Sequence, residues 1–174
     1  DGYIAMTGQR ALGLRQYSMR TPNGDPWHSR GHEVTEVAVG VSPADLPDRA
    51  QGYMSLDAFV WAAGDPSELR GERSRAMREW VERGGHLVVI LPPVGQTWTN
   101  PGSNDLHDIM PAVSVTREES VDLLPYRPML TRDRTGTFPP PGVVHSFKRL
   151  PSALPHEARR ILSGPDGKCV VVQR

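Results

Sequence analysis

Four residues with side chains found in hydrolase active sites lie together in the stretch SNDLHD: Ser103, Asp105, His107 and Asp108. A serine, a histidine and a carboxylate catalyse acyl transfer when they converge from different elements, with the serine on a strained turn. Residues this close in sequence more often begin a helix, and Ser103 or Asn104 is a natural N-cap for a helical turn over DLHDIM. We therefore favour a structural role for this stretch.

A second candidate is the stretch WHSRGHE, which holds His28, His32 and Glu33. Histidines four residues apart on a helix bind zinc, but the metalloprotease pattern places its glutamate directly after the first histidine. Here Glu33 follows the second histidine, and Gly31 argues against a helix. We favour a solvent-exposed loop and predict no metal site.

The single cysteine, Cys169, excludes an internal disulfide and a cysteine-based zinc site. It stands directly before three valines, which predicts a buried and unreactive thiol. The chain also contains no glycine-rich phosphate loop of the dinucleotide-binding or Walker A type. We therefore expect no cofactor.

Composition limits the class of protein. The chain has 174 residues, enough for one domain with a hydrophobic core. Its 20 Lys and Arg balance its 20 Asp and Glu, so nothing in the charge indicates a nucleic-acid partner. No segment approaches the ~20 apolar residues of a membrane span, so we expect no direct membrane insertion. A start at Asp-Gly and an end within CVVVQR lead us to expect a fragment of a larger protein.

The elements that would position these side chains are clearest in the first half. Strands are predicted over 3–7, 34–41, 57–63 and 86–91, and the last two are continuous apolar runs typical of strands buried on both faces. A helix separates them. Asp65 is a plausible N-cap for it, or the helix begins one turn later, after Gly71. Gly84 and Gly85 supply a left-handed C-cap, which completes a βαβ unit.

The second half has weaker patterns. LHDIM favours one or two helical turns, and strands are predicted over 112–120, 143–150 and 169–174. The stretch SALPHEARRIL, residues 152–162, favours a short helix with Pro155 near its start.

The string DLPDRAQGYMSLDAFVWAAGDPSEL, followed by AMREWVERGGHLVVILP, resembles the class I glutamine amidotransferase-like fold. The resemblance covers about residues 34–111 and is to the branch found as uncharacterised domains of bacterial membrane-anchored or exported proteins. It implies an α/β fold with a mainly parallel, flavodoxin-like central sheet and helices on both faces. We expect one such domain over residues 1–174, as an extracytoplasmic part of a membrane-anchored bacterial protein.

The resemblance also implies where a catalytic cysteine would stand. Amidotransferases place it on a tight elbow after a strand, beside backbone N–H groups that stabilise an oxyanion. The strand that could feed this elbow, 86–91, is followed by Pro92, Pro93, Val94 and Gly95, with no Cys, Ser or Thr. Two prolines also remove two N–H donors. We therefore predict no glutaminase activity.

A binding site would lie at the carboxyl ends of the parallel strands, where loops meet above the sheet edge. The loops concerned are Gly64–Ser67, Pro92–Trp98 and Asn104–His107, and they bring the candidate residues Asp65, Gln96, Trp98 and His107. Gln96 and Trp98 could wall a pocket or form a lid over the end of the sheet, and we favour the lid.

These observations favour a non-catalytic amidotransferase-like domain that interacts with a protein partner or senses a small-molecule ligand. The alternative is a hydrolase or amidase that uses a shifted nucleophile, Ser103 or Cys169, with His107 or His145. A nucleophile within hydrogen-bond reach of a histidine, in a cleft at the strand ends, would favour the enzyme.

Overall fold

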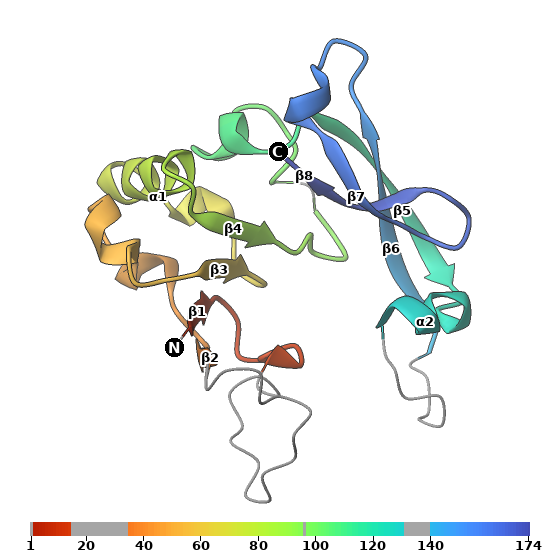
Figure 1. Cartoon of the computed structure of the whole chain (residues 1–174), viewed down its shortest axis with the longest axis horizontal. Coiled ribbons are helices and arrows are strands. Elements are labelled where there is room, and N and C mark those ends of the chain that lie inside the picture. The colour runs from red at the N-terminus through yellow and green to blue at the C-terminus, as the bar shows by residue number, and fades with distance from the viewer. Residues whose placement is uncertain (1, 15–34, 96, 131–139) are drawn as a thin grey trace, which may run out of the picture. The chain divides into compact units, whose positions relative to one another are not determined.

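The computed structural model describes residues 2–14, 35–95, 97–130 and 140–174 (Figure 1). The chain divides into two compact units. Unit 1 comprises Asp1–Pro92 and Gln96–Leu106, and unit 2 comprises Pro93–Gly95 and His107–Arg174. That the whole chain is one domain stays a prediction, and each unit is described by itself.

Unit 1 contains a parallel sheet. Its strands are β1 (Gly2–Met6), β2 (Thr35–Ala38), β3 (Ala58–Trp61) and β4 (His86–Val89), in the order β2-β1-β3-β4 (Figure 1). All three neighbouring pairs run parallel. The prediction that the four apolar segments of the first half form one parallel sheet, with a βαβ unit joining the last two, is therefore confirmed.

The two apolar runs differ in burial. In β3, Phe59, Val60 and Trp61 are all buried, as predicted. In β4, Val88 remains 46% exposed and Ile90, just beyond it, 43% exposed. The prediction that this strand is buried on both faces is wrong, because β4 is the outermost strand of the sheet among the described residues and one of its faces stays open.

The helix of the βαβ unit begins at the later of the two predicted positions. Asp65 caps a short 3-10 helix, Pro66–Glu68, where its carboxylate accepts the N–H of Ser67 at 2.9 Å. The helix α1 (Glu72–Glu82) then starts after Gly71, whose φ of +63° suits glycine. Ala76, Met77 and Trp80 lie on its buried face, and most of its charged residues are exposed. The later start predicted from the sequence is confirmed.

A Schellman motif ends α1. The N–H of Gly84 donates to the carbonyl of Val81 and the N–H of Gly85 to that of Trp80, both at 2.9 Å. Gly84 has a φ of +102°. A Cβ on Gly85 would lie 2.3 Å from the indole ring of Trp80. The first glycine therefore provides the left-handed turn, and the second allows Trp80 to pack against the backbone.

Unit 2 is an antiparallel sheet. Its strands are β5 (Val113–Val121), β6 (Gly142–Arg149), β7 (Arg159–Ser163) and β8 (Cys169–Gln173), in the order β5-β6-β8-β7. A short helix, α2 (Arg127–Leu130), and 3-10 helices at His107–Ile109, Leu124–Tyr126 and Pro155–Glu157 complete it. The strands predicted in the second half are confirmed, and so is the helical turn in LHDIM. The predicted helix in SALPHEARRIL is reduced to Pro155–Glu157, and the residues after it form β7.

The prediction of one mainly parallel sheet with helices on both faces is therefore wrong in its finer part. Unit 2 adds an antiparallel sheet, and α1 is the one α-helix among the described residues of unit 1. The physical reason lies in the connections. Parallel strands need a crossover of a dozen or more residues, whereas β7 and β8 are joined by a short turn around Asp166 and Gly167. Such a turn can form only a hairpin.

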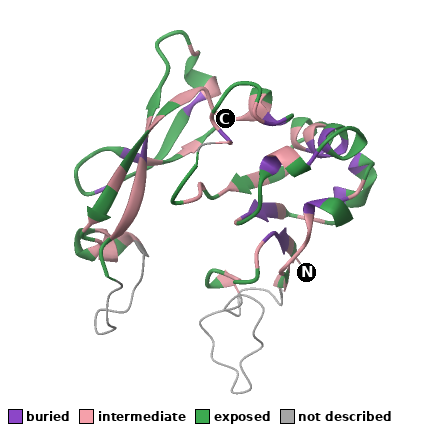
Figure 2. Cartoon of the chain, turned by 180° about the vertical axis from the view of Figure 1, so that it is seen from behind, coloured by how far each residue is buried: buried purple, intermediate pink, exposed green. Residues whose placement is uncertain are grey.

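The hydrophobic core lies in unit 1. Of the buried hydrophobic residues in the described part of the chain, only Ala158 and Cys169 belong to unit 2. Figure 2 shows the same contrast, with buried residues on β3 and α1 and exposed residues along β7. The described residues of unit 2 thus contribute little to the buried hydrophobic core.

Candidate functional site

The four residues predicted to form a binding rim are divided between the two units. Asp65 is exposed, with one carboxylate oxygen engaged in its cap. Trp98 belongs to unit 1 and His107 begins a 3-10 helix in unit 2. Gln96 lies outside the described residues. Ligand binding by this rim stays a prediction.

Trp98 is an interior residue of unit 1. Its side chain is 2% exposed, and its ring meets that of Trp61 edge to face, with centroids 5.2 Å apart and planes at 79°. Trp61 is the last residue of β3, and its indole N–H donates to the carbonyl of Gly64 at 3.1 Å. The lid favoured from the sequence is therefore what the structure shows for Trp98.

Polar groups next to this lid satisfy one another. The hydroxyl oxygen of Thr7, buried at the end of β1, accepts the N–H groups of Ala62 and Ala63 at 2.9 and 3.1 Å. The Asn104 side chain donates to the carbonyl of Thr97 at 2.6 Å and accepts the N–H of Leu106 at 2.9 Å. Among the described residues, no buried side-chain nitrogen or oxygen lacks a hydrogen-bond partner. The loops that leave the strands are thus fixed by their own polar side chains.

Ser103 has a structural role in the same segment. Its hydroxyl lies 2.6 Å from the carbonyl oxygen of Thr97 and 2.5 Å from that of Asn100, and it donates to these acceptors. The sequence offered Ser103 or Asn104 as a cap, and the side chain of Asn104 makes the bond to the following backbone. Ser103 and His107 belong to different units.

Asp105, a third member of SNDLHD, holds this segment against α1. Its carboxylate accepts the hydroxyl of Ser74 at 2.9 Å, and its carbonyl accepts a hydrogen bond from Arg78. Ser74 stands in the first turn of α1 and also contacts the carbonyl of Gly71 at 2.9 Å. The carboxylate that could have completed a catalytic triad therefore takes part in packing the lid on the helix.

Cys169 is buried in unit 2, as predicted. Its thiol donates to the carbonyl of Val171 at 3.1 Å, within its own strand. On the neighbouring strand β6, the residue paired with Cys169 is Phe147. His145 lies two residues before Phe147, and burial, followed by the charge of Arg117, lowers the pKa of this histidine below its usual value.

The described residues bear in part on the predictions about metal binding and membrane insertion. His28, His32 and Glu33 lie outside the described residues. Within the described ranges, no group of three or more His, Cys, Asp or Glu side chains is placed to hold a metal ion. None of the helices in those ranges has the length and apolar character to cross a membrane.

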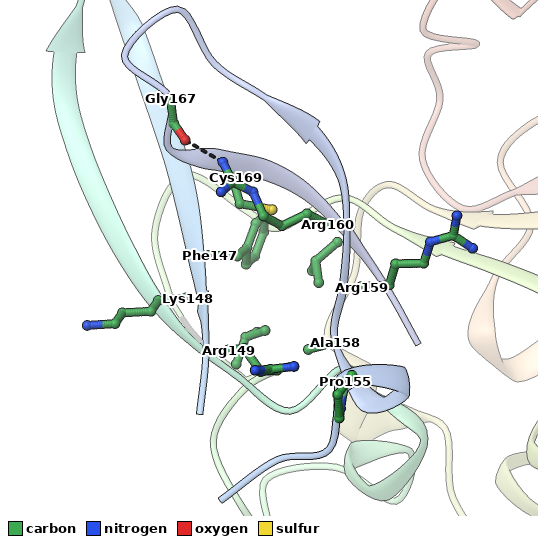
Figure 3. Close-up of a pocket in the computed structure, with 11 residues that line it drawn as sticks. Phe147, Lys148, Arg149, Pro155, Ala158, Arg159, Arg160, Gly167 and Cys169 are labelled. Carbon is green, nitrogen blue, oxygen red and sulfur yellow. Dashed lines mark hydrogen bonds between the residues drawn. The ribbon is translucent and has the colours of Figure 1, made fainter. Parts of the chain in front are cut away.

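A hollow of about 500 Å³ lies within unit 2, on one side of β8 (Figure 3). We call it the unit 2 hollow. Its apolar side chains come from β5, β6, β8 and the segment that leads into β7: Val113, Phe147, Pro155, Ala158, Cys169 and Val172. The backbone of Ala112, just before β5, ties this strand to the following segments: it donates to the carbonyl of Glu157 at 3.1 Å and accepts the N–H of Leu150 at 3.0 Å.

Basic residues border this apolar surface, and none of the described residues that line it is acidic. They are two pairs of consecutive residues, Lys148 and Arg149 on β6 and Arg159 and Arg160 on β7. In Figure 3, Arg149 lies toward Pro155, whereas Lys148 and Arg159 extend away from the centre. Arg160 donates to Ser163 at 2.7 Å and to the carbonyl of Gly167. The hollow therefore combines an apolar floor with a positive margin.

No single stretch of the sequence predicts this hollow, although two basic dipeptides that border it can be seen there. KR at 148–149 and RR at 159–160 each stand at an end of a short alternating or apolar stretch. Only the pairing of β6 with β8, and of β8 with β7, brings the two dipeptides to the same hollow. Local patterns do not indicate that pairing, because they favour a helix for the segment that holds Arg159 and Arg160.

Comparison with protein-family models, with curated proteins and with solved structures finds no match to this chain. Function is therefore inferred from the residues and from the geometry described above.

Proposed function

We propose that this chain is a non-catalytic, class I glutamine amidotransferase-like domain that binds a partner or ligand as part of a larger bacterial protein. The parallel sheet β2-β1-β3-β4 with α1 supports the first part of this proposal. It is the kind of framework that the sequence resemblance implies, over the segments that carry the resemblance. The antiparallel unit 2 would then be an addition to that framework.

The main support for a non-catalytic role is the identity of the hydrogen-bond acceptors of the two candidate nucleophiles. The hydroxyl of Ser103 and the thiol of Cys169 both donate to backbone carbonyls of their own segment. An activated nucleophile instead donates to a base such as histidine, which removes its proton during attack. A thiol in apolar surroundings also has little tendency to ionise. Both side chains therefore act as structural hydrogen-bond donors.

The end of β4 supports the same proposal. Pro92 and Pro93 follow it at the place where the resemblance implies a nucleophile elbow. An oxyanion hole uses backbone N–H groups at such an elbow, and proline has none. Close by, Trp98 fills the space above the last residue of β3. The site that catalyses amide hydrolysis in amidotransferases is thus replaced by packing.

The test is a measurement of ammonia released from glutamine, together with hydrolysis of an activated ester, by the whole chain and by Cys169→Ser and Ser103→Ala variants. We expect no ammonia release or ester hydrolysis above the buffer rate from any of them. The same assay tests the alternative, a hydrolase that uses Ser103 or Cys169 with His107 or His145. Ammonia release or ester hydrolysis that either substitution abolishes would overturn the proposal.

A further inference from the structure

We propose that the unit 2 hollow binds an extended acidic peptide segment, with its carboxylates at Arg149 and Arg159 and an apolar side chain on the floor. The inference rests on the proposed function, since it names the chemistry of a partner for a domain that acts by binding. Three features of the described residues carry it: two guanidinium groups that have no partner among those residues, an open apolar floor, and a strand edge with which no described strand pairs.

The charges point to an anionic partner. Within the part of the chain that the structure describes, Arg149 and Arg159 make no hydrogen bond or ion pair through their guanidinium groups. The nearest carboxylate in the sequence, that of Glu157, accepts the N–H of Leu154 at 2.7 Å and so closes its own turn. Asp166 pairs with Lys168 at 3.1 Å. Two arginines therefore present unused donors suited to carboxylates, which they bind in a bidentate geometry.

The floor indicates an apolar group beside those carboxylates. Phe147 and Val172 line the hollow next to the buried thiol of Cys169. A volume of about 500 Å³ lies within the range of ligand sites, about 300–1,000 Å³. Beyond it, Ile161 is 49% exposed and Leu162 40% exposed on β7. A purely ionic ligand would leave this apolar surface wet, whereas an apolar side chain would cover it.

The edge of the sheet favours a peptide over a small molecule. Among the described strands of unit 2, β7 is the outermost, and all five of its side chains are exposed. The outer edge of such a strand offers backbone N–H and C=O groups that another extended chain can pair with. A peptide added beside β7 would pass Arg159 at the margin and direct alternate side chains toward the hollow. Such a peptide would combine backbone hydrogen bonds to β7, ion pairs with the arginines and an apolar contact with the floor of the hollow.

The experiment measures binding of fluorescently labelled peptides to the whole chain by anisotropy. One peptide alternates glutamate with leucine, a second alternates lysine with leucine, and a third alternates glutamate with serine. The protein variants are Arg149→Gln, Arg159→Gln and the double variant. Arg75→Gln is the matched control, because Arg75 is an exposed arginine on α1 whose partner is Glu72. Melting temperatures of all variants are compared first, and exposed arginines on a surface are expected to leave them unchanged.

We expect the glutamate–leucine peptide to bind and the lysine–leucine peptide not to bind. Each single variant should weaken binding about two- to five-fold and the double variant about tenfold, since partly exposed ion pairs contribute modestly. High salt should weaken binding, Arg75→Gln should bind as the unchanged chain does, and glutamate–serine should bind more weakly than glutamate–leucine.

Equal binding of the acidic and basic peptides, or no loss in the double variant, would overturn the inference. A labelled single-stranded oligonucleotide that binds more tightly than the peptide, and is lost in the double variant, would assign the hollow to nucleic acid instead. These failures are separable from failure of the proposed function. If the chain neither binds the acidic peptide nor hydrolyses glutamine or the ester, only the peptide-binding inference is refuted. Hydrolysis that depends on Ser103 or Cys169 would instead refute the proposed non-catalytic function.

Discussion

Replacing Trp98 with alanine tests whether the lid over the parallel sheet is a structural plug. Trp98 is 2% exposed and packs edge-on against Trp61. Truncation of a buried aromatic costs about 3–5 kcal/mol, because it removes buried surface and leaves a cavity. For a chain of this length, 1 kcal/mol shifts the melting temperature by about 2–4 °C, so the expected drop is about 6–20 °C. Trp98→Phe retains an aromatic ring and should lose less.

The assay is thermal and urea unfolding followed by far-ultraviolet circular dichroism, with Trp98→Phe and Arg75→Gln measured alongside. We expect the melting temperature and the urea midpoint to be lowest for Trp98→Ala, intermediate for Trp98→Phe and highest for the unchanged chain. A Trp98→Ala variant that melts within about 2 °C of the unchanged chain would refute the packing argument, because a plug of this burial cannot be removed at so little cost.

Two further changes test the packing of α1 and its surroundings. Gly85→Ala should lower the free energy of unfolding by about 1–3 kcal/mol, because its Cβ would lie 2.3 Å from the ring of Trp80; an unchanged urea midpoint would contradict the packing of Trp80 against the backbone of Gly85. Burial raises the pKa of Tyr53, whose hydroxyl donates to the carbonyl of Pro47 at 3.4 Å. Because the folded pKa lies above the unfolded one, this contribution to stability is complete below about pH 10 and is lost as the pH rises above it. Tyr53→Phe should therefore lose less stability than the unchanged chain between about pH 9 and pH 11 in urea unfolding, and equal losses would contradict the burial argument.

The first half of the fold could be predicted because its signals are local. The apolar run at 57–63, the helix with its glycine pair and the next apolar run specify strand, helix and strand by periodicity and capping alone. The later helix start after Gly71 was one of two alternatives, since Asp65 and Pro66 form a good cap for either a 3-10 or an α-helix. Local signals thus determine the elements but not the residue at which the helix begins.

The second half could not be predicted as well because its order depends on long-range pairing. Periodicity indicated β5, β6 and β8 as strands without saying which neighbours they pair with. Arg159–Ser163 follows a proline and contains good helix formers, yet it pairs with β8 as a strand. Tertiary context decides such segments. The exposure of Val88 on β4 has the same origin, because an apolar run does not reveal whether it lies at the centre or at the edge of a sheet.

For the candidate sites, the sequence predicts the burial of individual residues better than it predicts which residues come together. Trp98 was placed correctly at the end of the sheet, and its burial agrees with the lid that was favoured. Cys169 was predicted to be buried because three valines follow it, and it is. Nothing local indicated that Phe147 and Cys169 face one another, or that two basic dipeptides border one hollow. Surfaces assembled from different strands leave little trace in any single stretch of sequence.

The most direct test of the central claim is a measurement of how fast the native chain reacts with electrophiles aimed at catalytic serines and cysteines. The chain is treated with a fluorophosphonate and with iodoacetamide, and modified residues are located by mass spectrometry, in buffer and again in urea. If Ser103 and Cys169 are structural donors, Ser103 remains unmodified in both conditions and Cys169 reacts only once the chain unfolds. Modification of Ser103 by the fluorophosphonate in the native chain but not in urea, or modification of Cys169 that is faster in the native chain than in urea, would contradict the claim, because only an assembled active site activates such a nucleophile.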